Sequence, residues 1–383
     1  MSAPAERAAD VIIIGGGLMG ASAAFFLRRR GRSVIVLERG LVGQQASGVN
    51  FGNVRRQGRH LEQLPLANRA REIWGRLAEL LGEDCEFYPG GHMRVCYTPQ
   101  QAEKVEAYAR DARAYGLDLE IISANGIRDR FPYIGREVVL GSLGPLDGHA
   151  NPRLVAPAFG RAAVRGGALI EENCEVLAID KAGEDFQVET RASGRFKAPV
   201  VLVAAGAWAG AMAARFGEPV PMYAKGPQMG VTEPAPYRIH PSLGVSTPHE
   251  HETVYLRQVS RGNIVFGGGR RTDPNLETFR AKVDPVNTLN QMTELRRLMP
   301  GIGNLRLIRV WSGVEGYLPD DLPVMGASAK VAGLYYAFGF CGAGFQIGPG
   351  VGDVMAELID TGATVTPIEP FHIRRFAAAK GGG

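Results

Sequence analysis

Several features that mark particular protein classes are scarce or missing in this chain of 383 residues. Seven histidines show no metal-ligand spacing and the cysteines form no C-x-x-C pair, so no zinc, iron–sulfur or other metal site is predicted. Low cysteine usage is also typical of a reducing compartment. With 43 basic and 39 acidic residues and no block of like charge, nucleic acid is not an expected partner. The only cysteines are Cys85, Cys96, Cys174 and Cys341.

Long hydrophobic segments are missing as well. The longest apolar run, Val11 to Leu27, is broken by four glycines and is shorter than the roughly 20 residues that a transmembrane helix needs. The N-terminal segment carries Glu6 and Asp10 without an apolar core, so no signal peptide is predicted. Since 45% of the residues are hydrophobic and 21% charged, intrinsic disorder is excluded. We therefore expect a globular cytoplasmic protein without a transmembrane segment.

Glycine, in contrast, is abundant: the chain has 51, about twice the usual share of ~7%. Gly15, Gly17 and Gly20 form a G-x-G-x-x-G pattern between the β-branched run Val11–Ile14 and a helix-like segment. In this pattern the glycines permit a tight turn, the approach of a pyrophosphate and close helix–strand packing. Glu38 ends the next predicted strand, 21 positions after Gly17, where a carboxylate binds ribose hydroxyls and disfavours a 2′-phosphate. The segment predicts a dinucleotide site.

The rest of the chain shows two kinds of predicted strand. Buried-strand runs return at 200–205 and 334–340, whereas short strands around 254–266 are typical of an antiparallel sheet. The predicted fold class is α/β, with a Rossmann-like dinucleotide-binding domain that is discontinuous in sequence and a mainly antiparallel α+β substrate domain. The expected boundaries are 1–85, 150–215 and 325–375 for the first domain, 86–149 and 216–324 for the second, and 376–383 for a disordered tail.

Two further loops bear on the cofactor, because NAD and FAD share the same glycine fingerprint. Residues 43–55 form a long polar, glycine-bearing loop directly after Glu38. Residues 338–349 pass from a strand through a glycine loop into a helix, whose N-terminus presents N–H donors to an electron-rich group. Together these loops suit a cofactor longer than one β-α-β unit can hold.

Taken together, six ordered segments resemble the D-amino-acid oxidase/sarcosine oxidase family of FAD enzymes, also described as the DAO or glycine-oxidase-like family. The resemblance spans nearly the whole chain and is closest to the catalytic subunits of opine and hydroxyproline dehydrogenases. It implies the two-domain fold of that family and FAD as the cofactor. The segments are VIIIGGGLMGASAAFFL (11–27), VIVLERG (34–40), ASGVNFGNVR (46–55), VLVAAGAWAG (201–210), WSGVEGYLPDDLPVMG (311–326) and GFCGAGFQIGPGVGD (339–353).

By this resemblance, cofactor-binding residues come from four parts of the chain. The ADP half is expected at Gly15, Gly17, Leu18, Met19, Gly20, Glu38 and Arg39. The ribityl chain and flavin are expected at Gln45, Ala46, Ser47, Asn50, Phe51, Gly52 and Asn53. The adenine-side strand and the nearby sheet end would contribute Val176, Ala205, Gly206 and Trp208. The isoalloxazine ring would lie near Gly313, Gly342, Ala343, Gly344, Phe345 and Gln346.

The attachment of the flavin is predicted to be non-covalent. Sarcosine oxidases of the family attach it through a cysteine in the region that corresponds to 311–320, where this chain has no cysteine and Gly313 occupies the matching place. Cys341 lies close to the predicted flavin loop, but a single thiol without a base is more often a small buried hydrophobe.

Departures from the family concern the substrate. Where amino-acid oxidases carry a carboxylate-binding arginine, this chain has Glu315, which either faces a cation or is an ordinary loop acid. Arg55 and Arg56 are the best replacements, since guanidinium–carboxylate pairing is bidentate, with Arg257 next in line. Tyr255 and Arg257 would lie on a strand over the pocket. The predicted catalytic or substrate-contacting set is Arg55, Arg56, Tyr255, Arg257, Glu315 and Gln346.

The resemblance implies an oxidoreductase that oxidises the Cα–N bond of an amino acid or secondary-amine acid (a D-amino acid, hydroxyproline, an opine or a sarcosine-like compound) by hydride transfer to flavin N5. Val265 stands where sarcosine oxidases keep a lysine that favours reaction with oxygen, so a dehydrogenase is expected. A peroxide-forming oxidase is the alternative, and a non-catalytic dinucleotide-binding regulatory protein is an alternative of another class. An electron acceptor or redox partner subunit is a possible partner, and transfer to quinone would imply peripheral membrane association.

Overall fold

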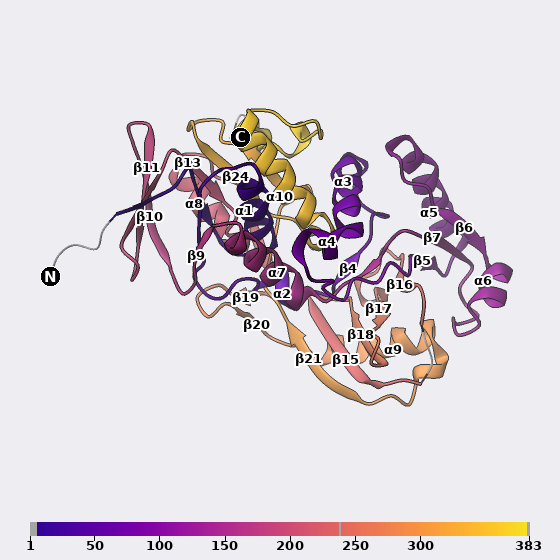
Figure 1. The fold of residues 1–383 in the computed structure, drawn as a ribbon. Coiled ribbons are helices and arrows are strands. Elements are labelled where there is room, and N and C mark those ends of the chain that lie inside the picture. Colours follow the sequence, from indigo (N-terminus) through magenta and orange to yellow (C-terminus); the bar gives the residue numbers. More distant parts are fainter. Residues whose placement is uncertain (1–5, 237–238, 381–383) are drawn as a thin grey trace.

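Two large β-sheets organise the protein, and the computed structural model that shows them describes residues 6–236 and 239–380 (Figure 1). The first sheet has six strands and the second has eight. In spatial order, the six strands are β23 (Val324–Ala327), β24 (Leu334–Phe338), β13 (Val200–Val203), β2 (Val11–Ile14), β3 (Val34–Leu37) and β9 (Leu169–Glu171). All neighbouring pairs in this sheet are parallel except β23–β24.

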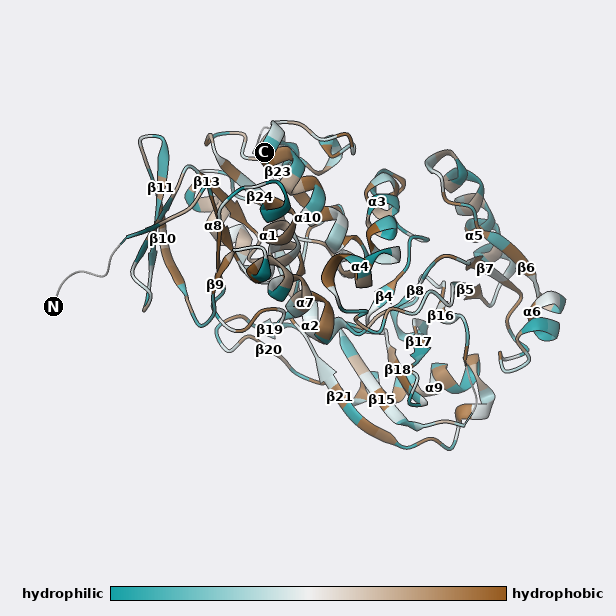
Figure 2. Ribbon diagram, viewed as in Figure 1, coloured by the Kyte–Doolittle hydropathy of each residue, from teal (hydrophilic) through white to brown (hydrophobic). Residues whose placement is uncertain are grey.

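Each face of the six-stranded sheet has a different cover, which explains the continuous apolar run of β2. Val11 and Ile13 pack against three helices, whereas Ile12 and Ile14 pack against a smaller sheet. Strands buried on both faces are expected to be apolar throughout. The brown segments of α1 in Figure 2 belong to the hydrophobic core on the helical side of the sheet. The helices are α1 (Leu18–Arg29), α7 (Pro152–Arg165) and α10 (Gly344–Thr361), and the smaller sheet contains β1 (Arg7–Ala8), β12 (Arg195–Ala198), β11 (Asp185–Thr190) and β10 (Val176–Ala182).

Helices α1 and α10, which lie more than 300 residues apart in sequence, pack against each other through small residues. A Cβ atom on Gly352 would lie 2.2 Å from Ser22 Oγ, so only glycine allows this approach. Ser22 Oγ also donates hydrogen bonds to the carbonyls of Leu18 (2.6 Å) and Gly348 (3.1 Å). This close contact holds the N-terminal ends of both helices at the same edge of the sheet.

The second sheet has one face covered by a helix and one face turned toward a cavity. Leu256 and Phe266 pack with Leu295 of helix α9 (Pro285–Leu298) on the covered face. The strands, in spatial order, are β21 (Leu307–Ser312), β15 (Gln228–Pro234), β18 (Asn263–Gly267), β17 (Tyr255–Gln258), β16 (Ser242–Val245), β5 (His92–Cys96), β7 (Leu140–Gly144) and β6 (Glu120–Ser123).

Strand register sets a row of residues across the other face of this sheet. Arg94 pairs with Gly244, which pairs with Tyr255; Tyr255 pairs with Gly267, and Gly267 pairs with Met229. Because side chains at paired positions point to the same face, Arg94, Tyr255 and Met229 share one surface. A Cβ on Gly267 would lie 2.4 Å from Tyr255 Cε2, so this glycine makes room for the tyrosine ring.

Shorter elements connect the two sheets. They are α2 (Ala46–Val49), β4 (Asn53–Val54), α3 (Leu64–Gly75), α4 (Leu77–Leu81), α5 (Pro99–Ala112), α6 (Ala124–Arg130), β8 (Gly148–His149), α8 (Ala209–Arg215), β14 (Tyr223–Lys225), β19 (Pro274–Asn275), β20 (Arg280–Ala281) and β22 (Glu315–Tyr317), with seven short 3₁₀ segments among the described residues. The predicted α/β class with two sheets of different type is confirmed.

The positions of the strands bear on the domain division. Strands of the six-stranded sheet come from 11–37, 169–203 and 324–338, and those of the eight-stranded sheet from 92–144 and 228–312. We propose the boundaries 1–85, 150–215 and 325–375 for the FAD-binding domain and 86–149 and 216–324 for the substrate domain. Residues 376–380 of the predicted disordered tail belong to the 3₁₀ helix Ile373–Lys380, in which Phe376 packs against the core. The tail stays a prediction, and 381–383 lie outside the described residues.

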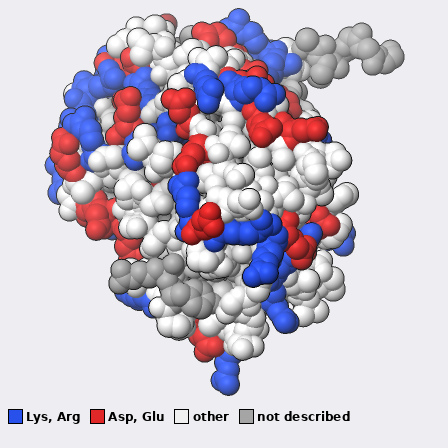
Figure 3. Space-filling model, turned by 90° about the vertical axis from the view of Figure 1, so that its right-hand side faces the viewer, with Lys and Arg blue, Asp and Glu red and all other residues white. Residues whose placement is uncertain are grey.

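The surface carries both signs of charge. On the face shown in Figure 3, Lys and Arg side chains are interspersed with Asp and Glu, and no single-sign field covers it. Across 6–236 and 239–380, no helix combines the length and apolar character required to cross a bilayer.

Candidate active site

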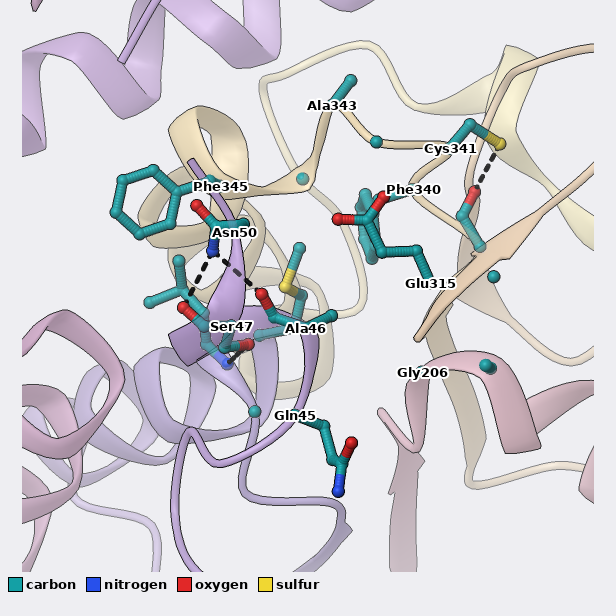
Figure 4. A pocket seen from close by; sticks show the side chains of 18 of the residues that line it. Gln45, Ala46, Ser47, Asn50, Gly206, Glu315, Phe340, Cys341, Ala343 and Phe345 are labelled. Atoms are coloured by element: carbon teal, nitrogen blue, oxygen red, sulfur yellow. Dashed lines mark hydrogen bonds between the residues drawn. The ribbon is translucent and has the colours of Figure 1, made fainter. Parts of the chain in front are cut away.

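A cavity of about 790 Å³ brings the predicted cofactor and substrate residues together. It is lined by the N-terminal ends of α1 and α10, the loop around α2 and the row of the eight-stranded sheet. Figure 4 shows Ala46, Ser47 and Asn50 on one side of it and Glu315 on another. Every predicted cofactor residue lines this cavity except Gly20 and Gly313.

Gly20 and Gly313 are both packing glycines. A Cβ on Gly20 would lie 1.9 Å from the carbonyl oxygen of Gly15, which agrees with its predicted role in helix–strand packing. A Cβ on Gly313 would lie 2.5 Å from Val49 Cγ2, and its N–H donates to the carbonyl of Pro227 (3.2 Å). Gly313 packs against helix α2 and does not line the cavity, and its expected position near the isoalloxazine stays a prediction.

The nucleotide end of the cavity is held by Glu38. Its two carboxylate oxygens accept hydrogen bonds from the N–H groups of Gly16 (2.6 Å) and Gly40 (2.7 Å). Each carboxylate oxygen has a further lone pair for a ribose hydroxyl. Arg39 lies over the rings of Phe279 (3.7 Å) and Trp208 (4.4 Å), and burial lowers the pKa of its guanidinium. These contacts form an aromatic and cationic wall at this end.

The loop around α2 forms the next part of the wall. Ser47 Oγ accepts the N–H of Leu18 (2.8 Å), which ties this loop to the start of α1. Asn50 Nδ2 donates to the carbonyls of Ala46 and Ser47 (both 2.9 Å), while Asn50 Oδ1 accepts the N–H of Gly52 (2.7 Å). The loop is thus fixed by its own side chains before any ligand binds.

Two observations test whether this cavity fits a flavin dinucleotide. Asn53 Oδ1 is buried without a hydrogen-bond partner among the described residues, although most buried polar atoms in proteins have one. A Cβ on Gly17 would contact only Ser47 Oγ (3.2 Å), so the space beside the start of α1 is open to a phosphate. The Asn53 amide oxygen can accept a hydrogen bond from a bound ligand, and the helix N-termini can bind phosphate groups. The residues of this cavity therefore fit FAD.

Arg55 and Arg56, the two predicted carboxylate-binding residues, have different surroundings. Arg55 is half-buried and lines the cavity. Arg56 does not line it: its Nε lies 3.0 Å from Oδ1 of Asp147, and its N–H donates to Oδ2 of the same residue (2.9 Å). A fully buried carboxylate already pairs with the Arg56 guanidinium, so Arg55 is the better placed of the two for a substrate carboxylate.

Arg257 is predicted to lie over the pocket with Tyr255, and only the tyrosine lies there. Tyr255 lines the cavity, with its ring 4.7 Å from that of Phe51. Arg257 points to the same face of β17 but is buried beneath the loop, where Nε donates to the carbonyl of Phe51 (2.7 Å). Arg257 does not line the cavity, and its guanidinium lies 5.5 Å from the Phe51 ring, so its predicted substrate contact has no support from this geometry.

Gln346 lines the cavity, but its side-chain nitrogen is occupied. Nε2 donates to the carbonyl of Ala67 (2.8 Å), and the main-chain carbonyl accepts the indole N–H of Trp74 (2.7 Å). These bonds join the start of α10 to α3. Gln346 therefore positions the glycine loop through its side-chain nitrogen, while its side-chain oxygen is buried without a hydrogen-bond partner among the described residues. Its catalytic role stays a prediction.

Cys341 and Val265, which the sequence places near the flavin, also have defined surroundings. Cys341 lines the cavity, accepts the N–H of Leu318 (3.3 Å), and has its thiol pKa raised to about 11 by burial, which makes it a poor nucleophile. Val265 lies on the predicted face of β18 but is buried in an apolar cluster with Phe51 and Met229. It does not line the cavity.

Glu315 faces the cavity, and a tyrosine holds it. Tyr317 Oη donates to Glu315 Oε2 (2.7 Å), and the Arg271 guanidinium lies 5.0 Å from the Tyr317 ring. Burial raises the pKa of the Glu315 carboxyl, while the hydrogen bond from Tyr317 and the charge of Arg271 act in the opposite direction. The folded protein therefore favours the protonated carboxyl more than water does.

Glu315→Gln should stabilise the protein increasingly as pH rises. A raised folded-state pKa contributes stability that is complete below the unfolded pKa of about 4.3 and is lost as pH rises through the folded value. Glutamine, which stays neutral and still accepts from Tyr317, avoids that loss. We expect melting temperatures that match near pH 4 and a variant that melts roughly 1–3 °C higher near pH 8. A difference that is independent of pH would contradict the burial effect.

The polar cavity residues that sequence reasoning missed include three arginines and a histidine. Arg59, Arg94, Arg271 and His92 all line the cavity. Arg59 could have been predicted from the sequence, because it lies four positions after Arg55 in the same loop. Arg94 could not be predicted from the local sequence, because its position depends on the pairing of β5 with β16, about 150 residues away. In the described parts of the chain, no group of three or more His, Cys, Asp or Glu is arranged to hold a metal ion.

Comparisons with known proteins agree with this geometry. Glycine oxidase of Geobacillus kaustophilus is 27% identical over 375 residues, covering 96% of this chain and 97% of the relative. An opine oxidase subunit of Rhizobium meliloti is 27% identical over 383 residues, covering 96% and 98%. The crystal structure of L-proline dehydrogenase from P. horikoshii superposes with a TM-score of 0.90 at 26% identity, covering 98% and 99%.

A family model described as FAD dependent oxidoreductase matches residues 10–358, nearly the whole of the part that forms the two sheets. The match includes both glycine loops and the residues that line the cavity between them. The chain belongs to the DAO family of FAD-dependent oxidoreductases.

Proposed function

We propose that this protein oxidises the Cα–N bond of an amino acid or a secondary-amine acid, and that Arg55 binds the substrate carboxylate. The observation that carries the proposal is the Arg55 guanidinium, which lines the same cavity as the flavin loop and forms no ion pair with any described carboxylate. Relatives named for glycine, opine and proline oxidation support an amine acid as the substrate class.

When bound, FAD supplies a two-electron acceptor, and the chain supplies binding and position. Arg55 fixes the carboxylate by bidentate pairing, which sets the orientation of the adjacent Cα–N bond. Tyr255 and Phe51 form an apolar wall that excludes water from the amine. Glu315 faces the same cavity, and burial raises the pKa of its carboxyl, which makes a negative charge beside the substrate carboxylate less favourable there than in water.

Anaerobic reduction of the purified protein tests this function. Amino acids of both configurations and their N-substituted forms are added without oxygen, and the visible absorbance of the flavin is followed. We expect bleaching by at least one amine acid and none by the amine that lacks its carboxylate. Failure of every amine acid to bleach the flavin would overturn the proposed function. Flavin released by acid into the supernatant would support non-covalent binding.

Mixing the reduced protein with air addresses the electron acceptor. We propose a dehydrogenase, since Val265 belongs to an apolar cluster where a lysine would favour oxygen reduction. The positively charged arginines of the same cavity favour the reduction of oxygen, so the rate of flavin reoxidation decides between the two effects. Slow reoxidation supports a dehydrogenase, whereas fast reoxidation with stoichiometric peroxide identifies an oxidase. A redox partner subunit and a cytoplasmic location stay predictions.

A further inference from the structure

Three arginines gather at one end of the cavity. Arg55 and Arg59 come from the loop after β4, and Arg94 comes from β5 of the eight-stranded sheet. All three line the cavity. A Cβ on Gly58 would lie 1.9 Å from Arg94 Nη1 and 3.3 Å from Arg55 Nη1, so these two nitrogens are at most about 5.2 Å apart, the sum of the two distances. Two guanidinium groups therefore lie side by side.

The protein neutralises none of these three charges. Arg59 donates to the carbonyls of Ala343 (2.8 Å) and Arg55 (3.2 Å), Arg94 donates to Ser246 Oγ (3.1 Å), and Arg55 donates to the carbonyl of Gln57. All of these acceptors are uncharged. Asp147, the acid beside this loop, pairs with Arg56. No ion pair joins the three arginines to a carboxylate within 6–236 and 239–380.

The arginines destabilise one another's charged forms. Burial and the neighbouring charge of Arg55 lower the pKa of Arg59 to about 9 and that of Arg94 to about 10. Burial also lowers the pKa of His92 beside them, with contributions from Arg55 and Arg94, so the neutral imidazole is favoured and adds no further positive charge. Unpaired charges in a buried site are costly, and proteins keep them where a ligand completes the pairing.

The roles of the three arginines differ. Arg59 spans from the 55–59 loop to Ala343 at the start of α10, and its hydrogen bonds to two carbonyls commit it to the backbone. Arg55 and Arg94 each use a single N–H group on the protein, and a guanidinium presents five donors. These two groups have the donor capacity to bind anions, while Arg59 adds positive charge to the same cavity.

We propose that the substrate carries two carboxylates, one bound by Arg55 and the other by Arg94. This inference rests on the proposed function and names the substrate class as an amine diacid. One carboxylate would compensate one of the three positive charges that line the cavity, whereas two leave a single charge, that of the backbone-bound Arg59. The cross-strand row places Arg94 next to Gly244 and then Tyr255, so the second carboxylate would extend from the amine along the sheet.

Binding of unreactive ligands to the FAD-loaded protein tests the proposal without turnover. Thiodiacetate has two carboxylates and (methylthio)acetate has one; both carry sulfur in place of the amine. By calorimetry we expect thiodiacetate to bind about tenfold to a hundredfold more tightly, because each charge-assisted pairing contributes that much. Arg94→Gln should reduce this preference to within about threefold. Arg94→Lys should keep part of it, since lysine retains the positive charge but cannot form the bidentate pair that a guanidinium forms.

A matched control is Arg128→Gln, which removes an exposed arginine of α6 and should keep the full preference. Equal affinity of the two ligands for the unaltered protein would overturn the proposal. So would an unchanged preference in Arg94→Gln, because both arginines would then hold one shared carboxylate. The outcomes are separable: bleaching by monoacids with no diacid preference leaves the proposed function intact, whereas a diacid preference without bleaching by any amine overturns that function alone.

Discussion

Replacing Gly17 with valine should give a folded protein that no longer retains FAD. Gly17 precedes α1 with φ −67° and ψ −179°, values that any residue adopts, and its only near neighbour is Ser47 Oγ. The added methyl groups would occupy the space where a pyrophosphate approaches the start of the helix. We expect at least a hundredfold weaker FAD binding, or about 3 kcal/mol.

The measurement is the flavin content of purified protein together with the melting temperature of the FAD-free form. Gly17→Ala should give an intermediate loss, since one methyl group fills less of the same space. Full occupancy in the valine variant would show that the phosphates bind elsewhere. A large drop in the melting temperature of the FAD-free protein would instead indicate that Gly17 supports the fold.

Arg55→Met should lower kcat/KM for amine acids by about a hundredfold to a thousandfold, while leaving the melting temperature nearly unchanged. The loss corresponds to about 3–4 kcal/mol, the range for removing a charge-assisted pairing that also orients the reacting bond. Because Arg55 faces the cavity and forms no ion pair with the protein, its removal leaves no buried carboxylate unpaired. Steady-state kinetics with an acid and its matching neutral amine should show the loss for the acid only.

Arg56→Met is the matched control, and we expect the opposite behaviour. It would leave Asp147, which is fully buried, without its partner, at a cost of about 3–5 kcal/mol of folding stability. Thermal unfolding should therefore separate the two neighbouring arginines. Normal stability in the Arg56 variant, or wild-type kinetics in the Arg55 variant, would reverse these assignments.

The parts of the fold that were predictable from sequence are those with local causes. Val11–Ile14, the glycines after it and Glu38 lie within thirty residues and report one β-α-β unit, because each residue type is required by the turn or strand where it stands. The second glycine loop follows the same logic at the start of α10. Most residues predicted to line the cofactor cavity are close in sequence to one of these two loops, which is why they were found.

The substrate end of the cavity depended on long-range pairing, and there the sequence was a poorer guide. Arg55 and Arg56 are adjacent, and only the position of Asp147 decides which one is free. Arg257 and Tyr255 share a face of β17, but Phe51 covers the arginine. Arg94 enters the cavity through the register between β5 and β16. Such outcomes follow from contacts between segments far apart in the chain, which no local pattern encodes.

The glycine contact between α1 and α10 has a consequence for how the protein matures. Helix α1 ends at Arg29, whereas α10 begins at Gly344, so the two walls of the cofactor cavity are synthesised more than 300 residues apart. The first β-α-β unit can form early, but it lacks the Gly352–Ser22 contact that brings the second glycine loop to its place. FAD is therefore expected to be captured only after α10 has left the ribosome, and then to connect two segments that lie far apart in the sequence.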